Sequence, residues 1–158
     1  MRLLVLSLAV AAVAACGSSE TPPDADEALA CVNSKRGDDY AVGLHRAGTA
    51  GLLDFKFVSA DPAPPARNLN TWVLQVSSMA NGVVGAPATG ATMTVTPFMP
   101  DHQHGAGAYT VQVQAMPDAG QYKLSQINTW MPGYWEVTIT ADAGGAHDTV
   151  VFKFCIQA

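Results

Sequence analysis

Charged residues are scarce in this sequence, and their scarcity excludes several classes of protein. Only 13% of the 158 residues are charged, and the formal net charge is −5. A basic surface for the phosphates of nucleic acid is therefore not expected. A helix-rich surface is also disfavoured, because it would need many Glu and Lys residues. Because 49% of the residues are hydrophobic, the chain is not intrinsically disordered, and its length suits one domain.

Long hydrophobic runs and enzyme motifs are also missing. No apolar run reaches the ~18 residues that a membrane-spanning helix needs. The sequence contains no G-x-S-x-G elbow, no H-E-x-x-H pair and no phosphate-binding loop. Acidic pairs such as Asp38-Asp39 lie in turn contexts that are typical of solvated surface. We therefore expect no catalytic residues and predict that the protein is not an enzyme.

The first residues resemble the export signal of a bacterial lipoprotein. Met1-Arg2 is followed by an apolar run over 3–14, and Val13-Ala14-Ala15-Cys16 resembles a lipobox. This pattern predicts a signal peptide over 1–15 and a lipid on Cys16; the alternative is an ordinary cleaved signal, with Cys16 incidental. Glycine rather than aspartate follows Cys16, which by resemblance to Gram-negative lipoproteins suggests anchoring on the periplasmic side of the outer membrane.

The other two cysteines indicate how the mature chain is held together. Residues 16–30 are polar, acidic and proline-bearing, and we expect a flexible tether there, followed by the domain over 31–158. An exported protein meets an oxidising compartment, so Cys31 and Cys155 are predicted to form a disulfide. The alternative is that the two thiolates bind a metal.

Short apolar segments separated by turn residues predict an all-β fold, an antiparallel β-sandwich of about seven to eight strands. In most of them apolar and polar residues alternate, as when Leu53, Phe55 and Phe57 flank Asp54 and Lys56. Tyr109 is expected on a buried face, and Cys155 on an outer face, so the disulfide should lie outside the sandwich. No stretch shows a convincing helical period. The expected strands are 40–46, 51–59, 69–78, 90–97, 108–115, 121–129, 134–141 and 149–156.

Three segments of the second half resemble a known family. They read GAPATGATMTV at 85–95, MPDHQHG at 99–105 and AGQYKLSQINTWMPGYWEVTITA at 119–141. Residues from about 70 to 156 resemble the YtkA-like domains, which are related to the FixH-like proteins. That resemblance implies an immunoglobulin-like sandwich with an accessory role outside the cytoplasm, for which copper handling is suspected.

Four side chains in these segments are of the types that copper(I) prefers. Copper(I) is a soft ion that takes thioether and imidazole ligands, and His102 and His104 are two residues apart, so an extended loop directs both to one side. Asp101 is expected to orient an imidazole, and Trp130 to lie beside the ion. Two alternatives stay open, a structural plug at the end of the sandwich or another metal such as zinc. The predicted copper ligands are Met99, His102, His104 and Met131.

Counting strands predicts which loops converge. Antiparallel strands reverse direction each time, so the loop with His102 and His104 and the loop with Met131 should share one end of the sandwich. Residues 61–67 should join them there. The same count places His45, Met116 and His147 at the other end.

Two functions are consistent with these features. The first is a metal-binding module that holds copper at one end of the sandwich and passes it to an acceptor protein. The second is a non-catalytic domain that contacts a protein of the cell envelope through that end or through an edge strand. Nucleic acid is not expected as a partner of either.

Overall fold

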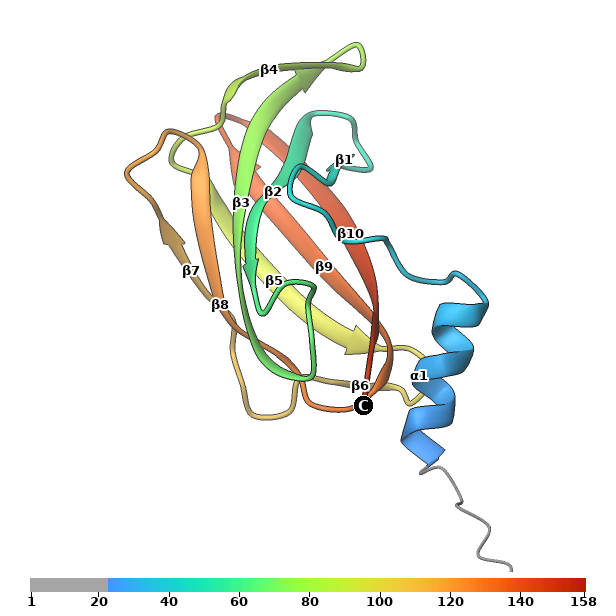
Figure 1. Cartoon of the computed structure of the whole chain (residues 1–158). Coiled ribbons are helices and arrows are strands. Elements are labelled where there is room, and N and C mark those ends of the chain that lie inside the picture. Colours follow the sequence, from blue (N-terminus) through green and yellow to red (C-terminus); the bar gives the residue numbers. More distant parts are fainter. Residues whose placement is uncertain (1–22) are drawn as a thin grey trace, which may run out of the picture.

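The computed structural model describes residues 23–158, which form two packed antiparallel sheets with one helix beside them (Figure 1). The predicted signal peptide, Cys16 and the start of the expected tether lie outside these residues. Within residues 23–158, no helix is long and apolar enough to cross a membrane. The prediction of an all-β sandwich is confirmed.

The first sheet has six strands in the order β1-β2-β3-β8-β7, with β4 paired to the end of β3. One of its strands, β8, carries a break in the alternation. Tyr122, Leu124 and Ile127 of β8 are buried, although Ile127 has the opposite parity, because the ladder with β3 shifts near Gln126, whose φ is +63°. The strands are β1 (His45–Ala47), β2 (Leu53–Asp61), β3 (Asn68–Ala80), β4 (Val83–Pro87), β7 (Gln112–Ala115) and β8 (Gln121–Thr129).

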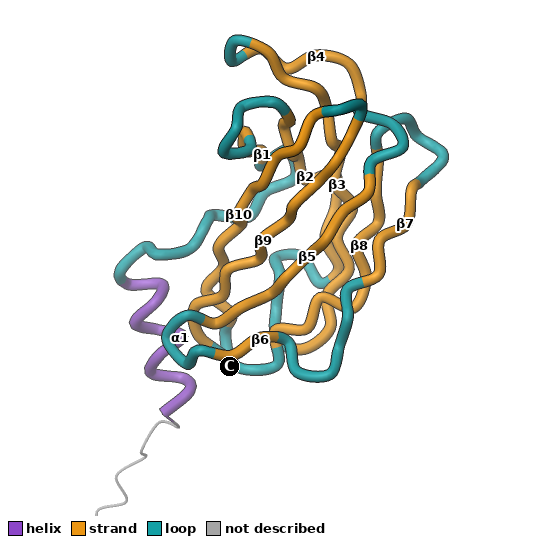
Figure 2. Tube along the Cα trace, turned by 180° about the vertical axis from the view of Figure 1, so that it is seen from behind, coloured by secondary structure: helices purple, strands orange, loops and turns teal. Residues whose placement is uncertain are grey.

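The second sheet has four strands in the order β10-β9-β5-β6 and forms the near face in Figure 2. Its strands are β5 (Thr92–Met99), β6 (His104–Gly105), β9 (Gly133–Ala143) and β10 (Ala146–Ile156). The short β4 and β6 strands were not expected from the sequence. The expected strand over 108–115 is shorter than predicted, and Tyr109 lies outside it with 49% of its surface exposed, so its predicted burial is wrong.

The core lies between the two sheets and is made of the inward residues of the long strands. Its centre is a group of aromatic rings: Phe57 packs edge-on against Trp72 and Phe152 at 5.0 and 4.9 Å between centroids. These side chains are 0% exposed. The alternation read from the sequence therefore identified the faces of β2, β3, β9 and β10 that are buried against each other.

A helix precedes the sandwich, contrary to the expectation that no segment is helical. Helix α1 (Pro23–Asn33) includes residues 23–30, which were expected to be part of the tether. Proline suits the first helical position, and acidic residues suit the first turn because of the helix dipole. Cys31 of α1 forms a disulfide with Cys155 of β10, with a Cα–Cα distance of 5.6 Å. Since Phe154 and Ile156 face the core, the disulfide lies on the outside, as predicted, and the thiolate alternative is wrong.

The two ends of the sandwich differ in their polar groups. The aspartate pole, at the β9–β10 turn, is organised by Asp148, which is 1% exposed. Its carboxylate accepts hydrogen bonds from the backbone N–H groups of Ala50, Leu52, Leu53 and Thr149. Burial alone would raise the pKa of Asp148, but these four donors hold the pKa below its usual value. The opposite end, formed by the β2–β3, β5–β6 and β8–β9 loops, is the histidine pole.

Candidate metal site at the histidine pole

The loops that carry the predicted ligands meet at one end of the sandwich. The His104 ring of β6 stacks on the Trp130 ring of the β8–β9 loop, with centroids 4.9 Å apart. The β2–β3 loop joins them, because Arg67 Nε donates a hydrogen bond of 2.9 Å to the Trp130 carbonyl. The predicted convergence of these three loops is therefore confirmed.

The remaining two histidines have other partners. His45 of β1 contacts Asp54 at 2.9 Å, and His147 contacts Asp142 at 2.7 Å near the β9–β10 turn. Both imidazoles are well exposed, at 59% and 68% of their side-chain surface. Neither lies with the predicted ligands, in agreement with the strand count.

Met99 is the innermost of the predicted ligands. It ends β5, is 0% exposed and belongs to the core. It is the direct ladder partner of His104 across the β5–β6 pair, so the two side chains lie on the same face of the sheet. Gly133 makes room for it, since a Cβ on Gly133 would lie 2.5 Å from Met99 Cε. Met99 therefore also fills the end of the sandwich, as the structural-plug alternative requires.

His104 combines a buried nitrogen with an aromatic surround. Beside Trp130, its ring contacts the edge of Trp135 with centroids 5.7 Å apart. Its Nδ1 lies 3.2 Å from the Gly105 carbonyl, which can only accept, so Nδ1 carries the proton. That leaves a lone pair on Nε2, which is buried and has no hydrogen-bond partner among residues 23–158. An unpaired buried acceptor is costly, and here it is also the atom that could ligate a metal.

His102 lies next to His104 and is held by a carboxylate that the sequence did not indicate. The two imidazole centroids are 5.9 Å apart. His102 Nε2 lies 2.6 Å from Oε2 of Glu27, a residue of α1. Two imidazoles bound to one ion at about 2.0–2.1 Å place their ring centres roughly 5–6 Å apart. The observed separation fits that arrangement.

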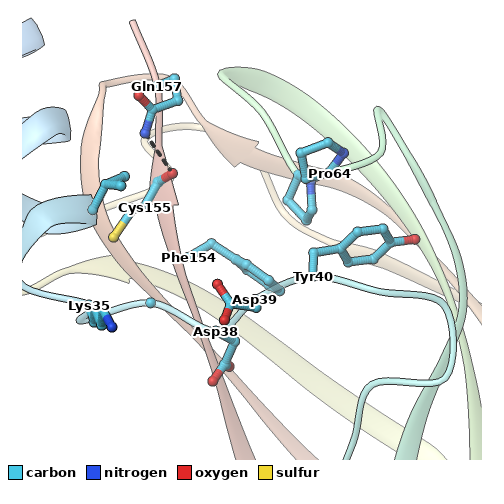
Figure 3. A pocket seen from close by; sticks show the side chains of 11 residues that line it. Lys35, Asp38, Asp39, Tyr40, Pro64, Phe154, Cys155 and Gln157 are labelled. Atoms are coloured by element: carbon cyan, nitrogen blue, oxygen red, sulfur yellow. Dashed lines mark hydrogen bonds between the residues drawn. The ribbon is translucent and has the colours of Figure 1, made fainter.

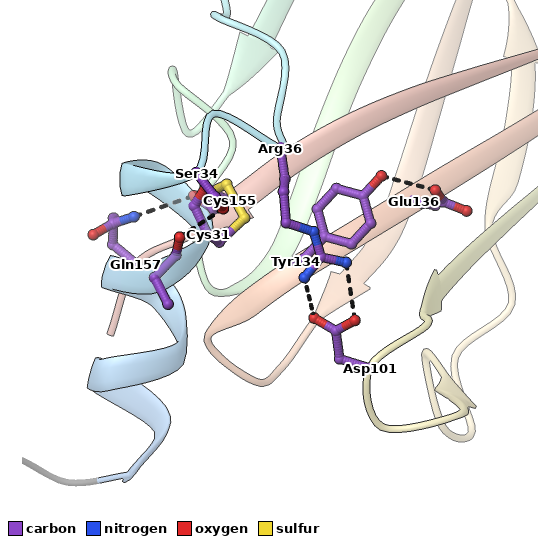
Figure 4. Close-up of a disulfide and its surroundings, with 9 residues drawn as sticks. Cys31, Ser34, Arg36, Asp101, Tyr134, Glu136, Cys155 and Gln157 are labelled. Carbon is purple, nitrogen blue, oxygen red and sulfur yellow. Dashed lines mark hydrogen bonds and ion pairs between the residues drawn. A yellow bond between two sulfur atoms is a disulfide. The ribbon is translucent and has the colours of Figure 1, made fainter.

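Asp101 does not orient an imidazole as expected. Both of its oxygens accept hydrogen bonds from the Arg36 guanidinium, at 2.6 and 2.9 Å (Figure 4). This pairing with Arg36 lowers the pKa of the Asp101 carboxyl. Arg36 also stacks on the ring of Tyr134, 4.0 Å from its centroid, and the Tyr134 hydroxyl donates to Glu136. Burial, reinforced by this bond to Glu136, raises the pKa of the Tyr134 phenol.

Trp130 and Met131 are neighbours in the β8–β9 loop, and the Trp130 ring borders His104. Trp130 is 41% exposed and stacks on His104, so it covers the imidazole from the solvent side. Met131 is partly buried and packs against the core. Its carbonyl accepts a hydrogen bond of 2.8 Å from Trp135 Nε1, which fixes the β8–β9 loop beside His104.

The classical metal-binding side chains at this pole are few. Within the described residues, no group of three or more His, Cys, Asp or Glu side chains is arranged to hold a metal. Glu27 and Arg36 were missed by sequence reasoning, and only the acidic residues before Cys31 could have pointed to Glu27.

A separate cleft of about 560 Å³ lies beside the disulfide (Figure 3). Tyr40, Pro64 and Phe154 form its apolar walls, and Asp38 and Lys35 lie on its polar side. Asp38 is already occupied, since its carboxylate accepts from the Lys153 backbone N–H at 2.9 Å and pairs with Arg46. The cleft contains none of the predicted ligands.

Comparisons with protein-family models, with curated proteins and with solved structures gave no match to the chain. The resemblance to the YtkA-like domains therefore stays a prediction from the sequence.

Proposed function

We propose that the protein binds one copper(I) ion at the histidine pole through His104, His102 and the thioethers of Met99 and Met131. The observation that carries this proposal is the buried, unpartnered Nε2 of His104. His104 is the ladder partner of Met99. The His104 imidazole and the Met99 thioether therefore lie on the same face of the sheet, at the histidine pole. A soft ion would supply the missing partner of Nε2.

The proposed setting is the cell envelope, where a YtkA-like sandwich anchored through lipidated Cys16 would carry copper on the periplasmic side of the outer membrane. The Cys31–Cys155 disulfide supports an extracytoplasmic location, because such bonds persist in oxidising compartments. Helix α1 begins at Pro23, seven residues after Cys16. Seven residues span at most about 25 Å, so an anchor on Cys16 would keep α1 and the histidine pole near the membrane.

An interaction module without metal is the second candidate, and the β3–β4 hairpin favours it. Val83 and Val84 of β4 are 68% and 46% exposed, and among residues 23–158 β4 pairs only with β3. An exposed strand edge with apolar side chains can receive a strand of a partner protein. This surface is separate from the histidine pole, so the two candidates can be tested independently.

The test is a copper(I) titration of the purified protein against a competing copper(I) chelator. Ascorbate keeps the copper reduced without the thiols that would open the disulfide. We expect one equivalent to bind, and at least a tenfold loss of affinity in the His102→Ala/His104→Ala double variant. The matched control is His45→Ala/His147→Ala, which also removes two imidazoles and should bind copper as the wild type does. Unchanged affinity in the first double variant would refute the proposed site.

A further inference from the structure

One contact at the histidine pole joins the site to a segment far away in sequence. His102 in the β5–β6 loop and Glu27 in α1 are 75 residues apart, and their side chains meet at 2.6 Å. Glu27 lies one helical turn before Cys31, so both residues are on the same face of α1. The disulfide of Cys31 with Cys155 joins that part of α1 to β10, and the Glu27 side chain reaches the β5–β6 loop from there.

The chemistry of this contact decides which nitrogen of His102 is available. A carboxylate only accepts hydrogen bonds, so Nε2 of His102 donates to Glu27. In the neutral imidazole the lone pair is then on Nδ1. Metal-binding histidines commonly donate their second ring nitrogen to a carboxylate, which fixes the tautomer and the ring orientation.

The other groups around His102 do not compete with Glu27 for this role. Asp101 is occupied by Arg36. The His102 backbone N–H donates to the Met99 carbonyl at 3.3 Å, and this turn folds His102 back toward the end of β5. The backbone therefore sets where the imidazole lies, while Glu27 sets how it is turned.

We infer that Glu27 is a positioning residue that holds His102 with Nδ1 directed to the copper ion. This inference rests on the proposed copper site and adds α1 to it. In this arrangement the helix next to the expected anchor is part of the metal site, although it supplies no ligand.

The first test measures copper(I) affinity in a double-mutant cycle. Glu27→Ala should weaken binding by about 10–100-fold, the usual cost of losing such a carboxylate. Glu27→Gln, which keeps an acceptor oxygen, should lose less. In the His102→Ala background, Glu27→Ala should cause no further loss, because Glu27 acts only through His102. Asp26→Ala, the adjacent acidic residue of α1, is the control and should leave affinity unchanged.

The second test determines the tautomer of His102 in the metal-free protein. In ¹⁵N-edited NMR spectra of the metal-free protein at alkaline pH, His102 should show a protonated Nε2 and a bare Nδ1, and Glu27→Ala should give a mixture of the two tautomers. A protonated Nδ1 in the wild type would overturn the inference, as would equal copper affinities of Glu27→Ala and the wild type, or an added loss in the His102→Ala background. If the wild type binds no copper, the proposed function and this inference both fail.

Discussion

The two ends of the sandwich treat a buried polar side chain in opposite ways. At the aspartate pole, Asp148 receives four backbone N–H donors and is fully occupied. At the histidine pole, Nε2 of His104 is buried without a partner among residues 23–158. A buried polar group with hydrogen-bond partners is compatible with a stable fold. A buried polar group without a partner lowers the stability, and its nitrogen or oxygen is free to bind a ligand. The two ends therefore differ in whether the fold itself satisfies their buried polar group.

Removing the Cys31–Cys155 disulfide tests whether the structure of the histidine pole depends on this bond. In Cys31→Ser/Cys155→Ser, we expect the free energy of unfolding to fall by about 4–5 kcal/mol, because the bond closes a loop of more than a hundred residues in the unfolded chain. Denaturant unfolding measures this loss. Hydrogen exchange should show the greatest loss of protection in α1 and the β5–β6 loop. An equal loss of hydrogen-exchange protection at the aspartate pole and at the histidine pole would contradict this expected difference between the two ends.

Removing the carboxylate at the aspartate pole should have the next largest effect. Asp148→Ala leaves buried backbone donors without an acceptor, and we expect a loss of about 3 kcal/mol in the free energy of unfolding. Copper(I) affinity should not change, since the site lies at the other end. Asp142→Asn, with its exposed carboxylate, is the control and should cost much less. A loss no larger than that of the control would show that the backbone donors find other partners.

The Asp148 carboxylate should also make the free energy of unfolding depend on pH. The pKa of Asp148 is lowered in the folded protein, so the folded state binds this proton less readily than the unfolded state does. Its stabilising contribution is therefore complete above the unfolded pKa of about 3.9 and is lost as the pH falls through the folded pKa. Unfolding measured from neutral pH to below pH 4 should show a shallower decline in Asp148→Asn than in the wild type.

The smallest effect on stability is expected from His104→Phe. Phenylalanine keeps an aromatic ring between Trp130 and Trp135 and removes the unpaired Nε2, at the cost of one hydrogen bond to Gly105. We expect the free energy of unfolding to change by less than about 1 kcal/mol, while copper(I) affinity falls at least tenfold. Thermal unfolding and the chelator titration measure the two quantities. A large destabilisation with unchanged copper binding would make His104 a structural residue.

The sequence predicted well those features that depend on local alternation. The pattern of β2, with Leu53, Phe55 and Phe57 turned one way, needs no knowledge of the rest of the chain, and all three are buried. The meeting of the β2–β3, β5–β6 and β8–β9 loops at one end was also predicted, because antiparallel strands reverse direction at each connection. The alternation failed where the backbone breaks it: the shift near Gln126 in β8 reverses the parity of Ile127, and no periodic rule contains such a shift.

The contacts that organise the site were beyond sequence reasoning. Asp101 was expected to orient a histidine, but its partner is Arg36, 65 residues away. The carboxylate on His102 comes from Glu27 instead, in a helix that lay within the expected tether. Which carboxylate meets which cation depends on how α1 is docked, and that docking is set by the disulfide and by burial of Ala28 and Cys31.

The position of the disulfide also determines how the domain responds to mechanical force. Cys31 and Cys155 lie near the two ends of the described residues, so the chain between them is a covalent ring. A pull between the segment before Cys31 and the residues after Cys155 passes through the sulfur–sulfur bond and does not shear the β-ladders. A protein tethered by its N-terminal side would therefore keep its sandwich intact under tension until that bond is reduced.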